Sequence, residues 1–296
     1  MTTEGGRDFY KTHSGTIIKT PEQGETSDVV ITGRPYGAVL ESLAIDPSER
    51  RDDQVFLSLG DGLSDFPARF EEATGATVIS SDPIYRVIRP TDTPDEARTK
   101  IQAAGLEGIA VTRNEKKMVP PKDWEHLRDV KRKGGNIVAD VEHLPFQNEQ
   151  LDGIMSAHAL RYIDVTKCLS EFARVLKDTG EMRFGHPGFE VGNQGKDIIV
   201  YPDKKHSDEY RDKLIKFLAQ FSEPLYCYML FEQKAEGQTG TVQTLVLSKS
   251  DQQPTFAERT KITKEKPKNY AVARINFQDI LTSGDGKSAW KAEVLR

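Results

Sequence analysis

The sequence predicts an α/β fold: a doubly wound, seven-stranded and mostly parallel sheet whose final strand is antiparallel. Short apolar runs such as Gln54–Leu59 alternate along the chain with amphipathic helical segments such as Thr166–Lys177. Right-handed crossovers between such strands pack helices on both faces of a parallel sheet. Two later β-rich runs, Leu225–Glu232 and Thr241–Ser248, are joined by a glycine-containing segment, which is typical of an antiparallel pair.

The central domain, residues 29–249, contains all of the predicted strands. They are short apolar runs, several of which lead into Gly, Asp or Ser, and the helices between them carry apolar residues at helical spacing. We predict strands over residues 54–59, 76–80, 136–139, 151–156, 181–185, 225–232 and 241–248. We predict helices over residues 36–43, 65–74, 166–177 and 208–221.

Three other segments differ from this pattern. Residues 1–28 are polar with no apolar period and are expected to form a flexible arm. Residues 86–135 are longer than a crossover requires, which indicates a functional insertion or lid with two helical patterns of its own. Residues 250–296 are a polar, lysine-rich extension, in which Tyr270–Leu281 alone carries enough apolar residues to dock.

Composition limits the function classes. The formal net charge of −5 gives no indication of nucleic acid binding. Cys168 and Cys227 lie in apolar segments and are interpreted as buried thiols, and no metal-ligand spacing is present, so we expect no metal site. No apolar run approaches the roughly 18 residues of a membrane helix, and the N-terminus lacks a signal-peptide core, so we expect a cytoplasmic protein away from membranes.

Glycines and polar side chains gather where the predicted strands end. In parallel sheets of this kind, ligands bind beyond the carboxyl ends of the strands, at the switch point of the strand order. The strand-end residues are Gly60-Asp61-Gly62, Asp82-Pro83, Asp140 and Ser156-Ala157-His158. They therefore predict one ligand site. Asp82 or Asp140 alone could cap a turn, but their order and spacing together favour a cofactor pocket.

Four segments carry a resemblance to a known family. They are VFLSLGDGLSDF (55–66), VISSD (78–82), ADVEHLPFQNEQLDGIMSAHALRYI (139–163) and EFARVLKDTGEMRF (171–184). Over residues 53–248 the chain resembles the class I S-adenosylmethionine (SAM)-dependent methyltransferases, of the methyltransferase-11-like type. The resemblance implies a Rossmann-like fold, SAM as the cofactor and methyl transfer as the reaction.

The resemblance also implies roles for the first two strand ends. Gly60 and Gly62 would let the backbone approach the methionine and ribose portion of SAM, where a Cβ would clash. Asp82, followed by Pro83, would accept hydrogen bonds from the two ribose hydroxyls. Each role follows from the position of the residue in the motif.

The third and fourth strand ends would complete the pocket. Asp140 would accept a hydrogen bond from the adenine amino group, and the backbone N–H of Val141 would meet a ring nitrogen. Leu144-Pro145-Phe146 would form an apolar wall beside the adenine. Ser156 is placed at the cofactor by its strand end, and Tyr36 could close over the cofactor or serve as a core contact.

Two positions depart from the family pattern. Ser58 stands where the family usually has an acid that holds the amino group of the methionine portion, and Ser64 stands where a glycine is frequent. Asp61, three residues after Ser58, is expected to compensate. We therefore include Ser58 and Asp61 among the cofactor-binding residues.

The candidate catalytic residues are His158 and Tyr162, which follow the fourth strand near the expected methyl group; His186 is a weaker candidate. His158 would act as a general base or would orient the acceptor, or it is a loop histidine bonded to backbone. The sequence Ser-Ala-His-Ala at this strand end lacks the Asn-Pro-Pro-Tyr signature of amino-group nucleic acid methylation, which favours a small-molecule acceptor. The alternative is a catalytically inactive methyltransferase-like fold that acts as an interaction or regulatory module.

Overall fold

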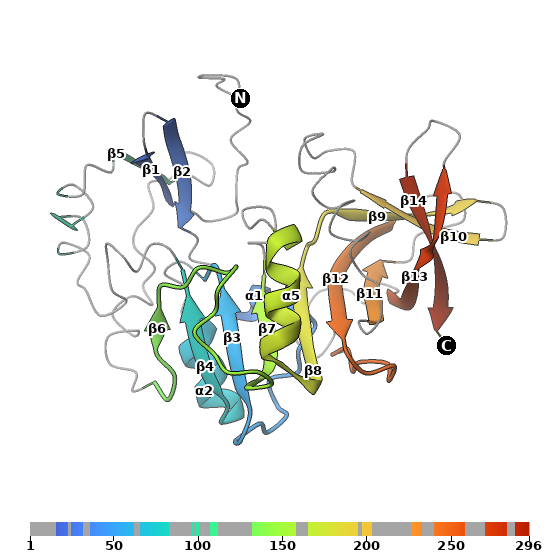
Figure 1. The fold of residues 1–296 in the computed structure, drawn as a ribbon, viewed down its shortest axis with the longest axis horizontal. Coiled ribbons are helices and arrows are strands. Elements are labelled where there is room, and N and C mark those ends of the chain that lie inside the picture. Colours follow the sequence, from blue (N-terminus) through green and yellow to red (C-terminus); the bar gives the residue numbers. More distant parts are fainter. Residues whose placement is uncertain are drawn as a thin grey trace.

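The computed structural model describes two β-sheets and the helices that accompany them (Figure 1). One sheet has eleven strands in the order β11-β13-β14-β10-β9-β12-β8-β7-β3-β4-β6, and the other has three in the order β2-β1-β5. The described residues are 16–22, 25–31, 36–61, 66–82, 96, 99–100, 103, 107–111, 132–157, 165–194, 197–202, 226–232, 240–257, 270–282 and 288–295.

Five neighbouring strands of the large sheet run parallel. From the edge inward they are β6 (Asn136–Ile137), β4 (Thr77–Ser81), β3 (Val55–Leu59), β7 (Leu151–Ser156) and β8 (Leu176–Gly185). Since β3 pairs with β4 on one side and with β7 on the other, the carboxyl ends of these three strands lie next to one another.

Helices cover both faces of the parallel strands. Helices α1 (Tyr36–Leu43) and α2 (Phe66–Thr74) lie on one face and α5 (Val165–Val175) on the other (Figure 1). Side chains of β3 alternate between the two layers, because successive residues of a strand point to opposite faces. Leu57 and Leu59 join the core cluster that contains Phe172 of α5, whereas Phe56 joins the cluster that contains Phe66 and Phe70 of α2.

The antiparallel strands close into a six-stranded barrel. They are β9 (Phe189–Gln194), β10 (Asp197–Pro202), β11 (Tyr226–Glu232), β12 (Gly240–Ser248), β13 (Tyr270–Thr282) and β14 (Ser288–Leu295). The pairing of β11 with β12 closes the ring, and β12 also pairs with β8 and so joins the barrel to the parallel strands. In β14, Trp290 and Ala292 are buried while Lys291 and Glu293 are exposed, the alternation expected of a barrel wall.

The predicted fold class is therefore wrong. The sequence predicts a helix-rich, doubly wound sheet of seven strands, but the described structure is mostly β, with a closed antiparallel barrel and few helices. The prediction missed β9 and β10 entirely, and it assigned the residues of β13 and β14 to a polar extension. A strand that buries one face shows only period-two alternation, as Trp290 and Lys291 of β14 do, and this alternation is a weak signal in a polar segment.

The smaller sheet joins segments far apart in the sequence. Strands β1 (Thr16–Glu22) and β2 (Glu25–Ile31) form a hairpin that begins in the expected arm, residues 1–28, and ends three residues beyond it. Strand β1 also pairs with β5 (Glu107–Val111) from the expected insertion. In Figure 1 this sheet lies on the side toward which β3 and β4 point.

Helix α1 is fixed at its C-terminal end by side chains from two strands. The last carbonyls of a helix have no partner within the helix and require donors from elsewhere. Arg183 of β8 donates to the carbonyls of Leu43 and Ala44 at 3.1 and 2.9 Å. Gln243 of β12 donates to the carbonyl of Glu41 at 2.9 Å, and Thr244 of the same strand donates to the carbonyl of Ser42 at 2.8 Å. These bonds fix the orientation of α1 against the sheet.

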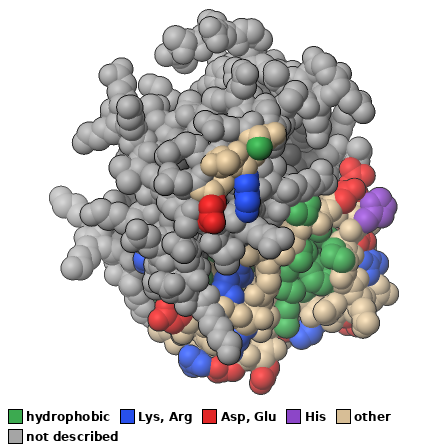
Figure 2. Space-filling model, turned by 90° about the vertical axis from the view of Figure 1, so that its left-hand side faces the viewer, with side chains coloured by type: hydrophobic (Ala, Val, Ile, Leu, Met, Phe, Trp, Pro, Cys, Tyr) green, Lys and Arg blue, Asp and Glu red, His purple; other side chains and the backbone are tan. Residues whose placement is uncertain are grey.

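Strand β6 is short, so side chains replace part of the missing strand beside β4. The carboxylate of Glu71 accepts the backbone N–H of Val78 at 2.8 Å, and Arg132 donates to the Val78 carbonyl at 2.5 Å. Figure 2, which faces the side of the molecule where β6 forms the sheet edge, shows apolar side chains gathered among charged ones. Val138, directly after β6, is 39% exposed.

Candidate functional site

The turn after β3 is fixed to the end of β4. Gly60 has a φ of 71°, a left-handed conformation that costs a residue with a Cβ about 1–2 kcal/mol. Its N–H donates to the carbonyl of Ser81 at 2.9 Å. The bond joins the two strand ends, and the absence of a side chain at Gly60 leaves the backbone open to close approach by a ligand.

Asp61 follows this turn and is shielded from solvent on one side. The hydroxyl of Ser58 donates to its Oδ1 at 2.6 Å, whereas its Oδ2 is buried and has no hydrogen-bond partner among the described residues. Burial and, to a smaller extent, the neighbouring Asp82 carboxylate raise the pKa of Asp61 from 3.8 to about 6. The Ser58 bond, the Arg132 charge and the nearby hydroxyl of Ser80 oppose the rise in this pKa.

Asp82 lies where the sequence predicts it, at the end of β4 and directly beside the Gly60 turn. It is 6% exposed, so a second carboxylate is buried in the same place as Asp61. Ser156, at the end of β7, is also buried, and its hydroxyl has no hydrogen-bond partner in the described part of the chain. The structure thus brings together polar residues from the ends of β3, β4 and β7.

Asp140 lies differently. Its side chain is 61% exposed, and its Oδ1 accepts the N–H of Glu142 at 2.9 Å, while its backbone carbonyl accepts the N–H of His143. The carboxylate therefore caps its own turn, which is the alternative interpretation that the sequence allowed. Val141, next to it, is half-buried against the core.

Helix α5 holds the Leu144-Pro145-Phe146 segment in place. Glu171 accepts the N–H of Leu144 at 2.7 Å, and Arg174 donates to the carbonyls of Leu144 and Phe146 at 3.2 and 2.9 Å. Hydrogen bonding from Arg174 lowers the pKa of Glu171. Sequence analysis missed both residues. Their signal was an acid and an arginine three residues apart on a helix, a spacing that brings the two side chains together.

Tyr36 is the first residue of α1. Its ring lies 5.9 Å from that of Phe66, and the Arg69 guanidinium lies 6.0 Å from the Tyr36 ring centroid. It packs with the core cluster of α1 and α2, in agreement with the core-contact alternative. His186 is exposed in the turn after β8, with a φ of 48°.

Several predicted site residues cannot be placed. Gly62, Ser64, Pro83, His158 and Tyr162 lie outside the described residues. Their roles stay predictions from the sequence. The described cofactor candidates are therefore those of β3, β4 and β7, the turn at Asp140 and Val141, and Tyr36 of α1.

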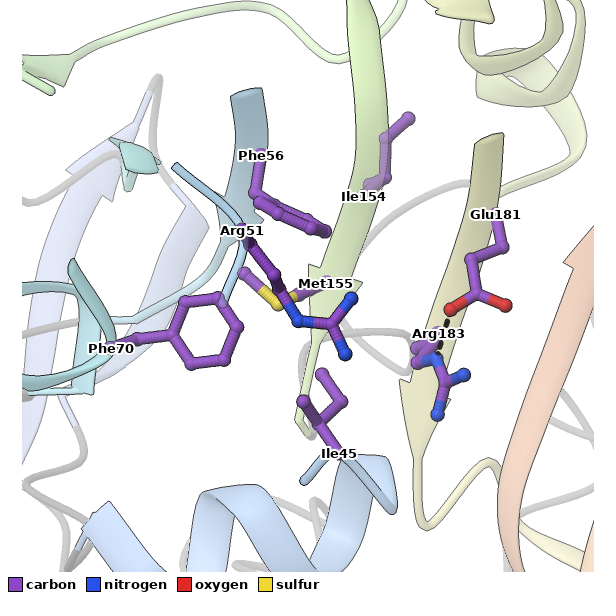
Figure 3. Close-up of a pocket in the computed structure, with 8 residues that line it drawn as sticks. All are labelled: Ile45, Arg51, Phe56, Phe70, Ile154, Met155, Glu181 and Arg183. Carbon is purple, nitrogen blue, oxygen red and sulfur yellow. Dashed lines mark hydrogen bonds and ion pairs between the residues drawn. The ribbon is translucent and has the colours of Figure 1, made fainter. Parts of the chain in front are cut away.

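A small cavity lies at the middle of the sheet, away from these strand ends (Figure 3). Arg183 reaches toward it and is paired there with Glu181 at 2.5 Å. The cavity has room for about one water molecule (about 10 Å³), so it is too small for a nucleoside. Its lining residues are Ile45, Arg51, Phe56, Phe70, Ile154, Met155, Glu181 and Arg183.

No group of three or more His, Cys, Asp or Glu side chains among the described residues is placed to hold a metal ion. None of the described helices combines the length and apolarity needed to cross a membrane.

Solved structures with similarity to this chain include several methyltransferases. A putative methyltransferase of Haloferax volcanii, in complex with the Trm112 methyltransferase activator, is 20% identical over 51% of each chain, with a TM-score of 0.31. A putative SAM-dependent methyltransferase of Methanococcus maripaludis is 13% identical over 74% of this chain and 87% of that one, with a TM-score of 0.37. The geranyl diphosphate C-methyltransferase of Streptomyces coelicolor A3(2) is 11% identical over 73% and 79%, with a TM-score of 0.40.

The chain thus spans about half the length of the Haloferax protein, 51%. No curated protein matches the chain. The family model described as "Methyltransferase domain" matches residues 111–184, a range that includes β6, β7, α5 and most of β8. This match confirms the resemblance of the chain to the class I SAM-dependent methyltransferases, whose cofactor is S-adenosyl-L-methionine.

Proposed function

We propose that this protein binds SAM at the carboxyl ends of β3, β4 and β7 and transfers its methyl group to a small-molecule acceptor. The observation that carries the proposal is the meeting of two shielded carboxylates, Asp61 and Asp82, beside the left-handed turn at Gly60. Oδ2 of Asp61 is buried without a hydrogen-bond partner among the described residues, and a buried acid is costly unless a ligand or partner group compensates it.

The residues of these strand ends suit the parts of SAM. Asp82 is a carboxylate at the end of the second strand, a position suited to accepting hydrogen bonds from two vicinal ribose hydroxyls. Because Gly60 has no side chain, the turn after β3 allows the methionine and ribose portion of the cofactor to approach the backbone closely. Ser156 and Asp61 each carry a buried oxygen that has no hydrogen-bond partner among the described residues, so both have capacity for a ligand.

The adenine portion would lie toward the 140–146 segment. Leu144 is buried and Phe146 is half-buried, and α5 holds both through Glu171 and Arg174. The exposed carboxylate of Asp140 caps the start of this segment, so in this proposal Asp140 shapes the turn, and the Val141 N–H is the candidate contact to the adenine ring.

When bound, SAM supplies a methyl group made electrophilic by its sulfonium. The protein's task is then to hold the acceptor in line with that group, and positioning of this kind supplies much of the rate. His158 is proposed as the base for an acceptor that loses a proton, and Tyr162 as a residue that orients the acceptor. A small-molecule acceptor is favoured by the Ser-Ala-His-Ala sequence at the end of β7, and we propose a cytoplasmic setting.

The proposal is tested by calorimetric titration of the full chain with SAM and with S-adenosylhomocysteine. We expect micromolar affinity for both, and a loss of about 1–3 kcal/mol in Asp82→Ala because ribose donors are left without a partner. Asp53→Asn, an exposed acid in the loop before β3, is the control and should bind as the wild type does. The absence of measurable binding at millimolar ligand would reject the cofactor site.

Acceptor identity requires a second experiment. Metabolite extracts incubated with the protein and SAM labelled in the methyl group should yield a labelled small molecule. Labelled nucleic acid or protein instead would refute the acceptor class. Once an acceptor is found, undiminished methyl transfer in His158→Ala would exclude His158 as an essential base.

A further inference from the structure

Helix α1 ends in a left-handed residue that carries a side chain. Ala44, directly after the helix, has a φ of 51°. Its N–H donates to the carbonyl of Glu41, and the N–H of Ile45 donates to the carbonyl of Leu40, both at 3.2 Å; this pattern of helix termination usually has glycine at the left-handed position. An alanine disfavours the left-handed conformation by about 5- to 30-fold, because its Cβ approaches the following carbonyl. Strain of this kind persists only where the surrounding structure enforces it.

Donors from outside the helix hold Ala44 in this conformation. Its carbonyl accepts Nη1 of Arg183 and the N–H of Ala257, both at 2.9 Å. The Arg183 guanidinium also donates to the carbonyl of Thr255 at 2.7 Å and lies 5.6 Å from the ring centroid of Phe256, in the segment that follows β12. Arg183 belongs to β8, which pairs with β12. The conformation of Ala44 is therefore set where the parallel strands join the barrel.

The other end of α1 lies against segments that follow the cofactor strands. The ring of Tyr36, the first residue of α1, lies 5.9 Å from the ring of Phe66, the first residue of α2, and α2 begins shortly after Asp61. Tyr36 and Ala157 pack against the same core cluster, and Ala157 directly follows Ser156 of β7. Because α1 is a rigid element of eight residues, a shift at its C-terminal end also moves its first residue.

We propose that Arg183 is a positioning residue for the cofactor site, which acts by holding Ala44 in its left-handed conformation and α1 against the parallel strands. The inference rests on the proposed function and adds that the junction with the barrel contributes to cofactor affinity. A protein whose binding-competent state is only partly populated loses apparent affinity in proportion to that population. Without Arg183, the left-handed conformation of Ala44 loses one of the two donors to its carbonyl, so the competent orientation of α1 becomes a minor state.

The test is calorimetric titration of the full chain with S-adenosylhomocysteine, at a temperature at which every variant is folded. Arg183→Ala should weaken binding by about 5- to 30-fold, the penalty for a left-handed alanine. Adding Ala44→Gly to this variant should restore the affinity to within about threefold of wild type, because glycine adopts the left-handed conformation without strain. Loss of fold stability alone would not be reversed in this way. The affinity of Arg183→Ala staying at the wild-type level, or a loss that Ala44→Gly does not reverse, would overturn the role of Arg183.

Trp290→Ala is the matched control for stability. Trp290 is 1% exposed inside the barrel and packs against Phe189, so its removal should destabilise the fold about as much as Arg183→Ala does. Its affinity for S-adenosylhomocysteine should stay within about twofold of wild type, since α1 keeps its donors. Equal losses of affinity in Trp290→Ala and Arg183→Ala would show that Arg183 acts only through stability, which contradicts the proposal.

Thr244→Val provides an independent variant if Arg183→Ala does not fold. It removes the hydroxyl that donates to the Ser42 carbonyl at the same helix end and keeps the shape of the side chain. We expect a loss of about two- to tenfold in affinity for S-adenosylhomocysteine, the range of one neutral hydrogen bond, and wild-type affinity here would overturn the proposal. If wild-type protein binds neither S-adenosylhomocysteine nor 5′-methylthioadenosine, which keeps the adenine and ribose but lacks the amino-acid portion, the proposed function fails and this inference fails with it.

Discussion

Acidification should weaken cofactor binding through Asp61. Burial, reinforced by Asp82, raises the pKa of Asp61 to about 6 in the ligand-free protein. An ammonium group binds the ionised carboxylate, so the apparent affinity scales with the ionised fraction of Asp61. Affinity should therefore fall about twofold at about pH 6 and about elevenfold at about pH 5, relative to pH 8.

The assay is titration with S-adenosylhomocysteine between about pH 5 and pH 8, repeated in two buffers of different ionisation enthalpy. Near pH 6 the wild type should release about half a proton on binding, because half of Asp61 is protonated before the ligand arrives. Asp61→Asn should show no such release, and 5′-methylthioadenosine should bind wild-type protein independently of pH. A wild-type affinity that is constant over this range, or a pH dependence that persists in Asp61→Asn, would refute the reasoning.

Acidification should weaken ligand binding, but through the same raised pKa of Asp61 it should stabilise the ligand-free fold. Because the folded-state pKa of about 6 lies above the ordinary 3.8, the folded protein binds this proton more tightly than the unfolded chain does. Protonation therefore stabilises the fold fully below about pH 4, and this contribution is lost as the pH rises through about 6. At about pH 8, where the charge is fully present, Asp61→Asn should raise the unfolding free energy by about 1–3 kcal/mol in urea titrations.

Three substitutions test the scaffold. Arg183→Ala should lower the unfolding free energy by about 3–5 kcal/mol, because Glu181 and the last carbonyls of α1 lose their partner. A loss below about 1 kcal/mol in urea titrations would contradict the anchoring role of Arg183. Glu171→Gln should lower the unfolding free energy by about 1 kcal/mol and weaken the binding of 5′-methylthioadenosine. Unchanged binding would show that α5 does not support an adenine site at Leu144–Phe146. Gly134→Ala would place a Cβ 1.8 Å from the Val78 carbonyl, so its melting temperature should fall by several degrees, whereas Gly135→Ala, with open space around it, serves as the control.

The parallel strands were predictable because their apolar runs are buried on both faces. The helix predicted over 65–74 is found at Phe66–Thr74, and the strand predicted over 54–59 is found at Val55–Leu59. Strands β13 and β14 were not predictable in this way. They alternate between barrel interior and solvent, as Trp290 and Lys291 of β14 do. They pair with each other, but each also needs a second partner from far away in the sequence, β11 for β13 and β10 for β14.

The candidate site shows a similar limit. Sequence order located Gly60, Asp61 and Asp82 at neighbouring strand ends, and the structure places them together. The direction in which each side chain points could not be predicted from the sequence. Asp140 caps its own turn, whereas Asp61 is oriented by Ser58. Which acid is shielded and which is exposed depends on tertiary packing, and no local sequence pattern encodes that packing.

The charge at Asp61 also distinguishes a protein that binds SAM from a fold that has lost the cofactor site. A fold that serves only as an interaction module gains nothing from a shielded carboxylate beside Asp82, and asparagine at position 61 would stabilise it. A protein that binds SAM gains a counter-ion that offsets this loss when the ligand enters. The two cases differ in one thermal measurement: saturating S-adenosylhomocysteine, at about 100 times the dissociation constant, should stabilise wild-type protein by about 2.7 kcal/mol. At that same ligand concentration the unfolding free energy of Asp61→Asn should increase much less, although this variant is more stable than wild type without ligand. If the ligand does not stabilise the wild-type protein, the protein has no cofactor site.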